Sequence, residues 1–157
     1  MAVGELTDES ADPLLRQGDL SARRLKLLVV IVLVVIIDQV TKQIAVTTLA
    51  DGPIEGPFGS SLRLILNRAA AFSLGEGFGP VFGTLAIVVT IGLFWIVRGV
   101  ERPSLVIGLG MIGGGAIGNV IDRAFRQGGD GFLGGAVIDF LSVGSWYPVF
   151  NLSLIHI

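Results

Sequence analysis

The chain has 157 residues, enough for one domain, and 52% of them are hydrophobic while only 15% are charged, well below the about 25% typical of soluble proteins. This composition indicates a membrane protein, and the net charge of −2 provides no basic surface for nucleic acid. Because there is no Cys and the single His is His156, disulfides are excluded and a zinc or haem site built on His or Cys is not expected.

The first predicted element is a membrane helix that follows an acidic tail. Residues 1–22 carry five acidic residues and few large apolar ones, which indicates a disordered tail. An unbroken apolar run then extends from Leu27 to Ile37, and moderately apolar sequence continues to about Ala50. Since a span needs about 20 residues, we expect one membrane helix over residues 26–50.

The rest of the chain alternates between mixed and apolar segments. Within the mixed residues 51–76, "SLRLILN" (61–67) alternates as a short strand does. Two uncharged runs follow and predict further spans over 77–97 and 103–121. Four basic residues precede the first helix and two lie in the turn at 98–102, so we expect the N-terminus and this turn to be cytoplasmic and the mixed segments to be outside.

Charged residues inside the predicted first helix need a partner. Asp38 lies in "DQVTK", where an isolated charge within a membrane helix costs on the order of 3 kcal/mol. Lys42 is four residues further along the same helix face and is placed to pair with it. We expect an internal ion pair that fixes the helix or supports a nearby site, rather than a directly catalytic group.

A glycine-rich segment marks the third predicted span. In "GMIGGGAIGNVIDR" the residues Gly110, Gly114 and Gly118 recur every four positions, and small residues at this spacing let membrane helices approach closely. A dinucleotide-binding fingerprint is rejected because the segment lies in an uncharged run with no surrounding βαβ pattern. The polar end of the segment carries Asn119, Asp122 and Arg123.

Two isolated polar residues stand out in the mixed segments. Asn67, in "LILNRAAAFSL", precedes a run of small residues and suggests a tightly packed turn. Asp139, in "AVIDF", is flanked by apolar residues, so desolvation is expected to raise its pKa. Trp146 and Tyr147 have the character of interface anchors, which would place Asp139 near the membrane surface. Taken alone, Asp139 is also compatible with a capping or turn role.

From about Lys26 to Asn151 the motifs "DQVTK", "NRAAAFS", "GGGAIGNVIDR", "AVIDF" and "PVFN", in this order, resemble lipoprotein signal peptidase (signal peptidase II). The resemblance implies an all-α polytopic membrane protein of the bacterial cell (inner) membrane. The family has four transmembrane helices, of which three spans are present here, and a small extracytoplasmic β-rich cradle. It also implies an aspartic endopeptidase that removes signal peptides from diacylglyceryl-modified prolipoproteins before the lipidated cysteine, at the extracytoplasmic face. It needs no metal or cofactor, and its partners are this substrate and membrane lipid.

The resemblance also assigns roles to residues. Asp139 matches one member of a catalytic aspartate dyad, and the second would close an FNxAD motif at position 154, where this chain has Leu154. The residues that the resemblance places around the dyad as supporting groups are Asp38, Lys42, Asn67, Asn119, Asp122, Arg123 and Asn151.

The sequence departs from the family in three places. Ala69 stands where the family usually has Gly, and residues 126–135 form a longer segment, expected to be a flexible outer loop. After Asn151 the match ends, and "LSLIHI" resembles one reading frame of a transposon-end sequencing adaptor. We therefore expect residues 152–157 to be a non-native tail and the chain as written, which lacks the second aspartate, to be inactive. A divergent homologue is the alternative.

Two other function classes fit part of this pattern. One is a small membrane transport protein with Asp38, Asp122 and Asp139 as cation sites, and the other is a structural membrane protein held together by glycine-rich helix packing. Neither accounts for Asn67 in the mixed outer segment or for "AVIDF" placed outside the membrane.

Overall fold

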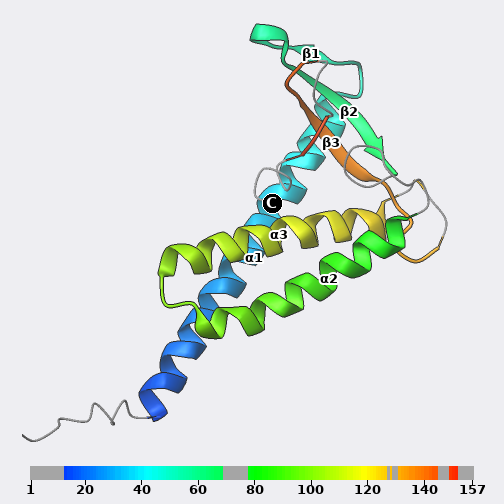
Figure 1. The fold of residues 1–157 in the computed structure, drawn as a ribbon. Coiled ribbons are helices and arrows are strands. Elements are labelled where there is room, and N and C mark those ends of the chain that lie inside the picture. Colours follow the sequence, from blue (N-terminus) through cyan, green and yellow to red (C-terminus); the bar gives the residue numbers. More distant parts are fainter. Residues whose placement is uncertain (1–12, 69–77, 127, 129–130, 145–148, 152–157) are drawn as a thin grey trace, which may run out of the picture.

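The computed structural model describes residues 13–68, 78–126, 128, 131–144 and 149–151. Three long helices and a small sheet follow one another along the chain (Figure 1). In order the elements are α1 (Pro13–Thr48), β1 (Ile54–Glu55), β2 (Ser61–Asn67), α2 (Gly79–Ile96), α3 (Pro103–Phe125) and β3 (Val137–Ser142), with short 3-10 turns at Pro57–Gly59 and Val97–Gly99.

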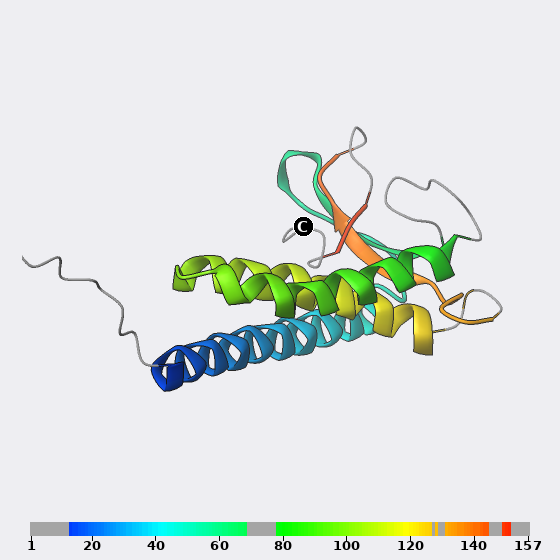
Figure 2. The same ribbon diagram turned by 60° about the horizontal axis from the view of Figure 1, so that its bottom comes forward.

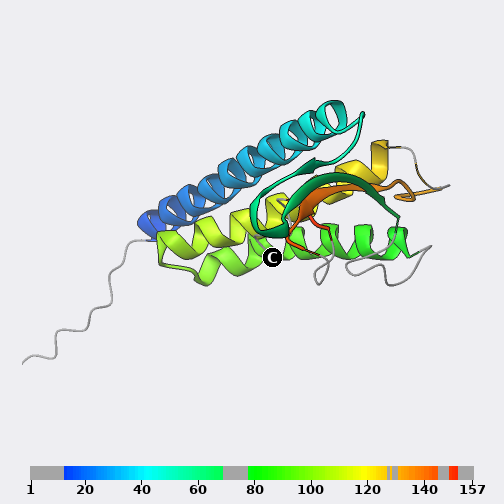
Figure 3. The ribbon, with the colours of Figure 1, turned by 90° about the horizontal axis from the view of Figure 1, so that it is seen from above.

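Helix α3 lies between α1 and α2 and packs against both (Figure 3). The approach to α1 is close because glycines face it. A Cβ atom at Gly114 would lie 2.5 Å from Val34 Cβ and 3.0 Å from the Ile31 carbonyl oxygen, and one at Gly110 would lie 2.6 Å from Val30 Cγ1. Only glycine fits at these distances, so the helix contact expected from the four-residue spacing is confirmed within the chain.

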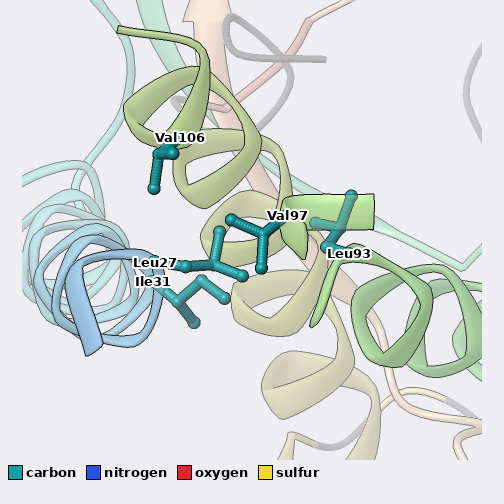
Figure 4. Packing of buried hydrophobic residues seen from close by; sticks show 5 residues of the cluster. All are labelled: Leu27, Ile31, Leu93, Val97 and Val106. Carbon is teal, nitrogen blue, oxygen red and sulfur yellow. The ribbon is translucent and has the colours of Figure 1, made fainter. Parts of the chain in front are cut away.

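An apolar cluster joins the three helices at the end of the bundle that holds the α2–α3 turn. Figure 4 shows its side chains pointing toward one another from all three helices and the turn. Each is at most 6% exposed: Leu27, Ile31, Leu93, Val97 and Val106. Leu27 and Ile31 are one helical turn apart on α1, so the cluster fixes how α1 lies against the other two helices.

Two helices match the spans predicted at 77–97 and 103–121. Segments Gly79–Gly99 and Pro103–Phe125 are long and apolar enough to cross a membrane. Predicted span 26–50 falls largely within α1, and its crossing of the membrane stays a prediction.

The expectation of a disordered tail is wrong for residues 13–22, which form the start of α1. The reason is one ion pair within the helix and one hydrogen bond from the helix to a distant part of the chain. Asp19 pairs with Arg23 four residues later, and Arg23 Nη1 donates to the Val100 carbonyl oxygen at 2.9 Å. The first turns of α1 are therefore tied to the α2–α3 connection, while residues 1–12 lie outside the described part of the chain.

The sheet lies over the end of the bundle where α1 ends and α2 begins (Figure 2). The strand predicted at 61–67 is confirmed as β2, which pairs antiparallel with β1 on one side and β3 on the other. Strand β3 was not anticipated as a strand. Its register places Ile65 opposite Asp139 and Asn67 opposite Val137.

Strand β3 is buried on both faces. Ile138 and Phe140 point to one side and join Ala45 of α1 and Leu49, just after the end of α1, in a second apolar cluster. Because successive side chains alternate across a strand, Asp139 points to the opposite side. The same strand thus separates an apolar interior from a polar one.

The connection from α3 to β3 is partly anchored. Gly135 N donates to the Arg123 carbonyl oxygen at 3.0 Å, and Leu133, which is 5% exposed, packs where a Cβ atom at Gly83 of α2 would stand. Residues 131–135 thus return onto α2 and α3. The outer loop expected over 126–135 is packed against the helices in this stretch.

Candidate active site

Asp139 is almost fully buried, with 1% of its surface exposed, and both carboxylate oxygens accept hydrogen bonds. Asn67 Nδ2 donates to Oδ2 and Asn151 Nδ2 donates to Oδ1, each at 2.8 Å. Asn67 reaches Asp139 because it ends the neighbouring strand β2. Asn151 is brought there by an antiparallel bridge in which Phe150 pairs with Leu141 through two backbone hydrogen bonds of 2.8 and 2.9 Å.

Burial dominates the proton affinity of Asp139. It raises the pKa of the Asp139 carboxyl above its ordinary value, and the nearby charge of Asp122 adds to this. The hydrogen bonds from Asn67 and Asn151 and the charge of Lys42 act in the opposite direction. A carboxyl with a raised pKa is suited to proton transfer at pH values closer to neutral.

The ion pair predicted in "DQVTK" is present and larger than expected. Lys42 is fully buried, and its Nζ lies 2.8 Å from Asp38 Oδ2 and 2.7 Å from Asp122 Oδ2. The same Nζ donates to Asn119 Oδ1 at 2.9 Å. An ammonium has three protons, so these three acceptors use its full donor capacity.

Asp122 ties the ionic cluster to the sheet. Its Oδ2 accepts a hydrogen bond from the Ile138 backbone nitrogen at 3.2 Å, next to Asp139, and its Oδ1 lies 2.7 Å from Arg126 Nε. Gln39 Nε2 contacts the same Oδ1 at 3.3 Å and the Gly118 carbonyl oxygen at 3.1 Å. Helices α1 and α3 and strand β3 are therefore joined through one carboxylate.

Arg126 and Gln39 belong to this site but were missed from the sequence. The signal for Arg126 was available, since it lies four residues after Asp122 and such a pair shares a helix face. Gln39 is adjacent to Asp38 in sequence and would be expected to point elsewhere. Its Nε2 nevertheless reaches Asp38 Oδ2 at 3.2 Å, and the approach of α3 adds the Gly118 carbonyl oxygen and Asp122 Oδ1 as acceptors.

The site residues form one connected network. Asn119 Oδ1 also accepts from Asn151 Nδ2 at 3.2 Å, which links the ionic cluster to Asp139. Hydrogen bonds and ion pairs therefore connect Asp139 to these predicted supporting residues: Asp38, Lys42, Asn67, Asn119, Asp122 and Asn151.

Arg123 lies beside this network. It is 7% exposed, its charge interacts with those of Asp139 and Asp122, and its Nη1 lies 3.0 Å from where a Cβ atom at Gly79 would stand. Its side chain therefore extends toward the start of α2. Ala69, the anchors Trp146 and Tyr147, and the tail 152–157 with position 154 lie outside the described residues.

Within the described ranges, no group of three or more His, Cys, Asp or Glu side chains is arranged to hold a metal ion. The polar groups that surround Asp139 are side-chain amides and charged groups already engaged with one another. The arrangement is chemically suited to holding a carboxylate at a defined position and to controlling its protonation.

Comparison with known proteins gives a consistent family. A family model described as Signal peptidase (SPase) II matches residues 30–157. The lipoprotein signal peptidase of Mycobacterium tuberculosis is 44% identical over 134 residues, which cover 83% of this chain and 65% of the relative. That of Mycobacterium avium is 44% identical over 138 residues, covering 86% of this chain and 74% of the relative. A solved structure described as a bacterial membrane enzyme aligns with a TM-score of 0.69 at 28% identity, over 83% of this chain and 79% of that one.

Proposed function

The chain belongs to the signal peptidase II family, and from this premise we propose that it is an intramembrane aspartic endopeptidase with Asp139 as one catalytic carboxylate. Its substrates are diacylglyceryl-modified prolipoproteins, from which it removes the signal peptide before the lipidated cysteine. The chain spans about 65% of the length of the Mycobacterium tuberculosis relative. The observation that carries the proposal is the buried Asp139 carboxylate, held on both oxygens by amide donors.

The chemistry requires a second carboxylate close to Asp139. Two carboxylates at short distance cannot both ionise easily, so they share one proton and titrate as a pair. The ionised member takes a proton from water as the water oxygen attacks the peptide carbonyl carbon. The protonated member donates to the carbonyl oxygen and later helps the amine to leave.

The side chains around Asp139 support this reaction by fixing its position. Asn67 and Asn151 hold the two carboxylate oxygens, so Asp139 cannot rotate away from the reacting bond without losing both hydrogen bonds. Arg123 contributes a positive charge that interacts with Asp139. Lys42 and Asp122 anchor the helices that carry these residues.

The charges favour an orientation with the site outside. Arg98 and the start of α1 lie at the end of the bundle where Arg23 contacts Val100, and the sheet lies at the other end. Basic residues accumulate on the cytoplasmic side of membrane proteins. We therefore place the N-terminus in the cytoplasm of a multi-pass inner-membrane protein with spans in α1, α2 and α3, and Asp139 near the extracytoplasmic surface.

Position 154 decides whether the sequence as printed can act. It is Leu154, where the family's second aspartate is expected, and one carboxylate cannot perform both proton transfers. We therefore expect no cleavage by the 157-residue chain. A cation-transport function has less support, because the Asp38 and Asp122 carboxylates are already paired with Lys42.

A cleavage assay on a synthetic prolipoprotein peptide carrying a diacylglyceryl cysteine tests the proposal. A version that restores x-Ala-Asp at positions 152–154, followed by an apolar helix, should cleave before the modified cysteine. Asp139→Asn in this version should lose activity by about 10²–10⁴-fold, the range for general acid–base groups, while the exposed Asp51→Asn keeps it. Retained cleavage in Asp139→Asn contradicts the catalytic role of Asp139, and turnover by the unrestored chain contradicts the need for an aspartate at position 154.

A further inference from the structure

In the network around Asp139, Lys42 determines which group donates and which group accepts in the hydrogen bonds that lead to Asp139. An ammonium can only donate, so every group that faces Lys42 Nζ must present an acceptor. Asn119 therefore turns Oδ1 toward Lys42, at 2.9 Å, and not its amide nitrogen. Lys42 is fully buried, so water does not take the place of Asn119 at its ammonium group and the constraint stays in force.

The orientation of the Asn119 side chain in turn orients the side chain of Asn151. The Oδ1 atom of Asn119 also receives Asn151 Nδ2 at 3.2 Å, and the same Nδ2 donates to Asp139 Oδ1 at 2.8 Å. Both amide protons of Asn151 are thereby directed, one to each oxygen. Its own Oδ1 is buried and has no hydrogen-bond partner among the described residues, so the orientation is not set by an acceptor contact on that side.

Reversing the Asn151 amide would be costly at both ends. Its oxygen would then face Asp139 Oδ1, which is tolerable only if Asp139 carried a proton on that oxygen. It would also face Asn119 Oδ1, and Asn119 cannot reverse in turn, because its amide group would then point at the Lys42 ammonium. The assignment of the amide ends thus follows from the charge at Lys42.

We propose that Lys42 is a positioning residue for Asp139: it fixes the direction of the Asn119–Asn151 amide pair and so holds Asp139 Oδ1 as an acceptor. With Asn67 on the second oxygen, the carboxylate form of Asp139 is the form that satisfies its neighbours. In the peptidase reaction proposed above, on which this consequence rests, Asp139 takes the proton from water. The proton shared by the pair then starts on the other carboxylate.

A test must separate the electrostatic effect of Lys42 on Asp139 from its effect on the orientation of the Asn119 and Asn151 amides, because several charged groups face Asp139. Lys42 lies on α1, and Asp122 and Arg123 lie on α3. Removing Lys42 would change the field at Asp139 even without any amide link. The informative variant is therefore Asn119→Leu, which cuts the link between Lys42 and Asn151 without altering any charge.

The measurement is an infrared pH titration of the 157-residue chain in lipid nanodiscs, with the Asp139 carboxyl band identified by its loss in Asp139→Asn. No turnover is needed, so the result is independent of the cleavage assay. Asn119→Leu should raise the protonation midpoint of Asp139 by about one pH unit, a tenfold change in proton affinity. The matched control is Gln39→Leu, another neutral amide that contacts the ionic cluster but not Asn151, and it should leave the midpoint within about 0.3 unit.

An unchanged midpoint in Asn119→Leu, or an equal rise in Gln39→Leu, overturns the proposal, because Lys42 would then act through its charge or not at all. A protonated Asp139 in the unmodified chain at pH 7 overturns it as well. If Asn119→Leu does not fold, judged by circular dichroism and size-exclusion chromatography, the smaller neutral variant Asn119→Ala takes its place, because it cuts the same link without altering any charge. Asn119→Ala should raise the midpoint in the same direction, and no rise refutes the proposal.

Discussion

Replacing Gly114 by Ala should separate α1 from α3. The new Cβ atom would lie 2.5 Å from Val34 Cβ and 3.0 Å from the Ile31 carbonyl oxygen. Since carbon atoms in contact prefer about 3.5–4.0 Å, the helices must part by about 1 Å, and a gap of this size forfeits a quarter to a half of each contact's attraction. Overpacking of a close contact costs about 1–3 kcal/mol.

Gly108→Ala on the same helix is the matched control. A Cβ atom there meets nothing within 4 Å, so this variant gains only the helix propensity of Ala over Gly, about 1 kcal/mol. Both variants share that gain, so the difference between them reports overpacking alone. Reversible unfolding in mixed detergent micelles should show Gly114→Ala less stable than Gly108→Ala by about 1–3 kcal/mol. Equal free energies of unfolding would mean that the two helices do not meet at Gly114 as closely as described.

Three further predictions concern the site and the core. Lys42→Met leaves two buried carboxylates without their ammonium and should cost about 3–5 kcal/mol, measured by the same unfolding assay. Burial raises the pKa of Asp139, so the folded chain binds that proton more tightly than the unfolded chain does, and stability should fall as pH rises from about 3.9, the ordinary Asp value, to the raised value. Asp139→Asn should abolish this slope, and a slope that persists would show that other groups cause it. Leu27→Ala, at a fully buried position, should cost about 2 kcal/mol or more, whereas Leu28→Ala, 46% exposed, should change stability by less than about 0.5 kcal/mol, as thermal unfolding of both variants would show.

Local patterns in the sequence predicted the elements and the pairs that depend on one element. The alternation of "SLRLILN" gave strand β2, and the glycine spacing identified the close face of α3. The pairing of Asp38 with Lys42 follows from a four-residue helical spacing, which needs no knowledge of the rest of the fold.

Contacts between different helices and strands could not be predicted from these local patterns. The sequence does not show that Asp122 reaches across to Lys42, or that the backbone of β3 donates to the same carboxylate, because both depend on how α1, α3 and the sheet are placed. The resemblance to a family predicted that these residues lie near one another, but it did not predict which of their atoms are in contact. The helical start of α1 was missed for a related reason, since the sequence does not show the tertiary contact of Arg23 with Val100, and only one of the five acidic residues of the predicted tail, Asp19, lies within residues 13–22.

The two-sided burial of β3 has a consequence for assembly. A slip of one residue in its pairing with β2 exchanges the two faces of the strand. Such a slip would insert the Asp139 carboxylate among Ala45 and Leu49 and place Ile138 before Asn67. Neither side tolerates the exchange, so a misregistered sheet gains nothing from docking onto the helices. Docking of the sheet onto the helices therefore favours the correct register of β3, and the same docking buries the Asp139 carboxylate.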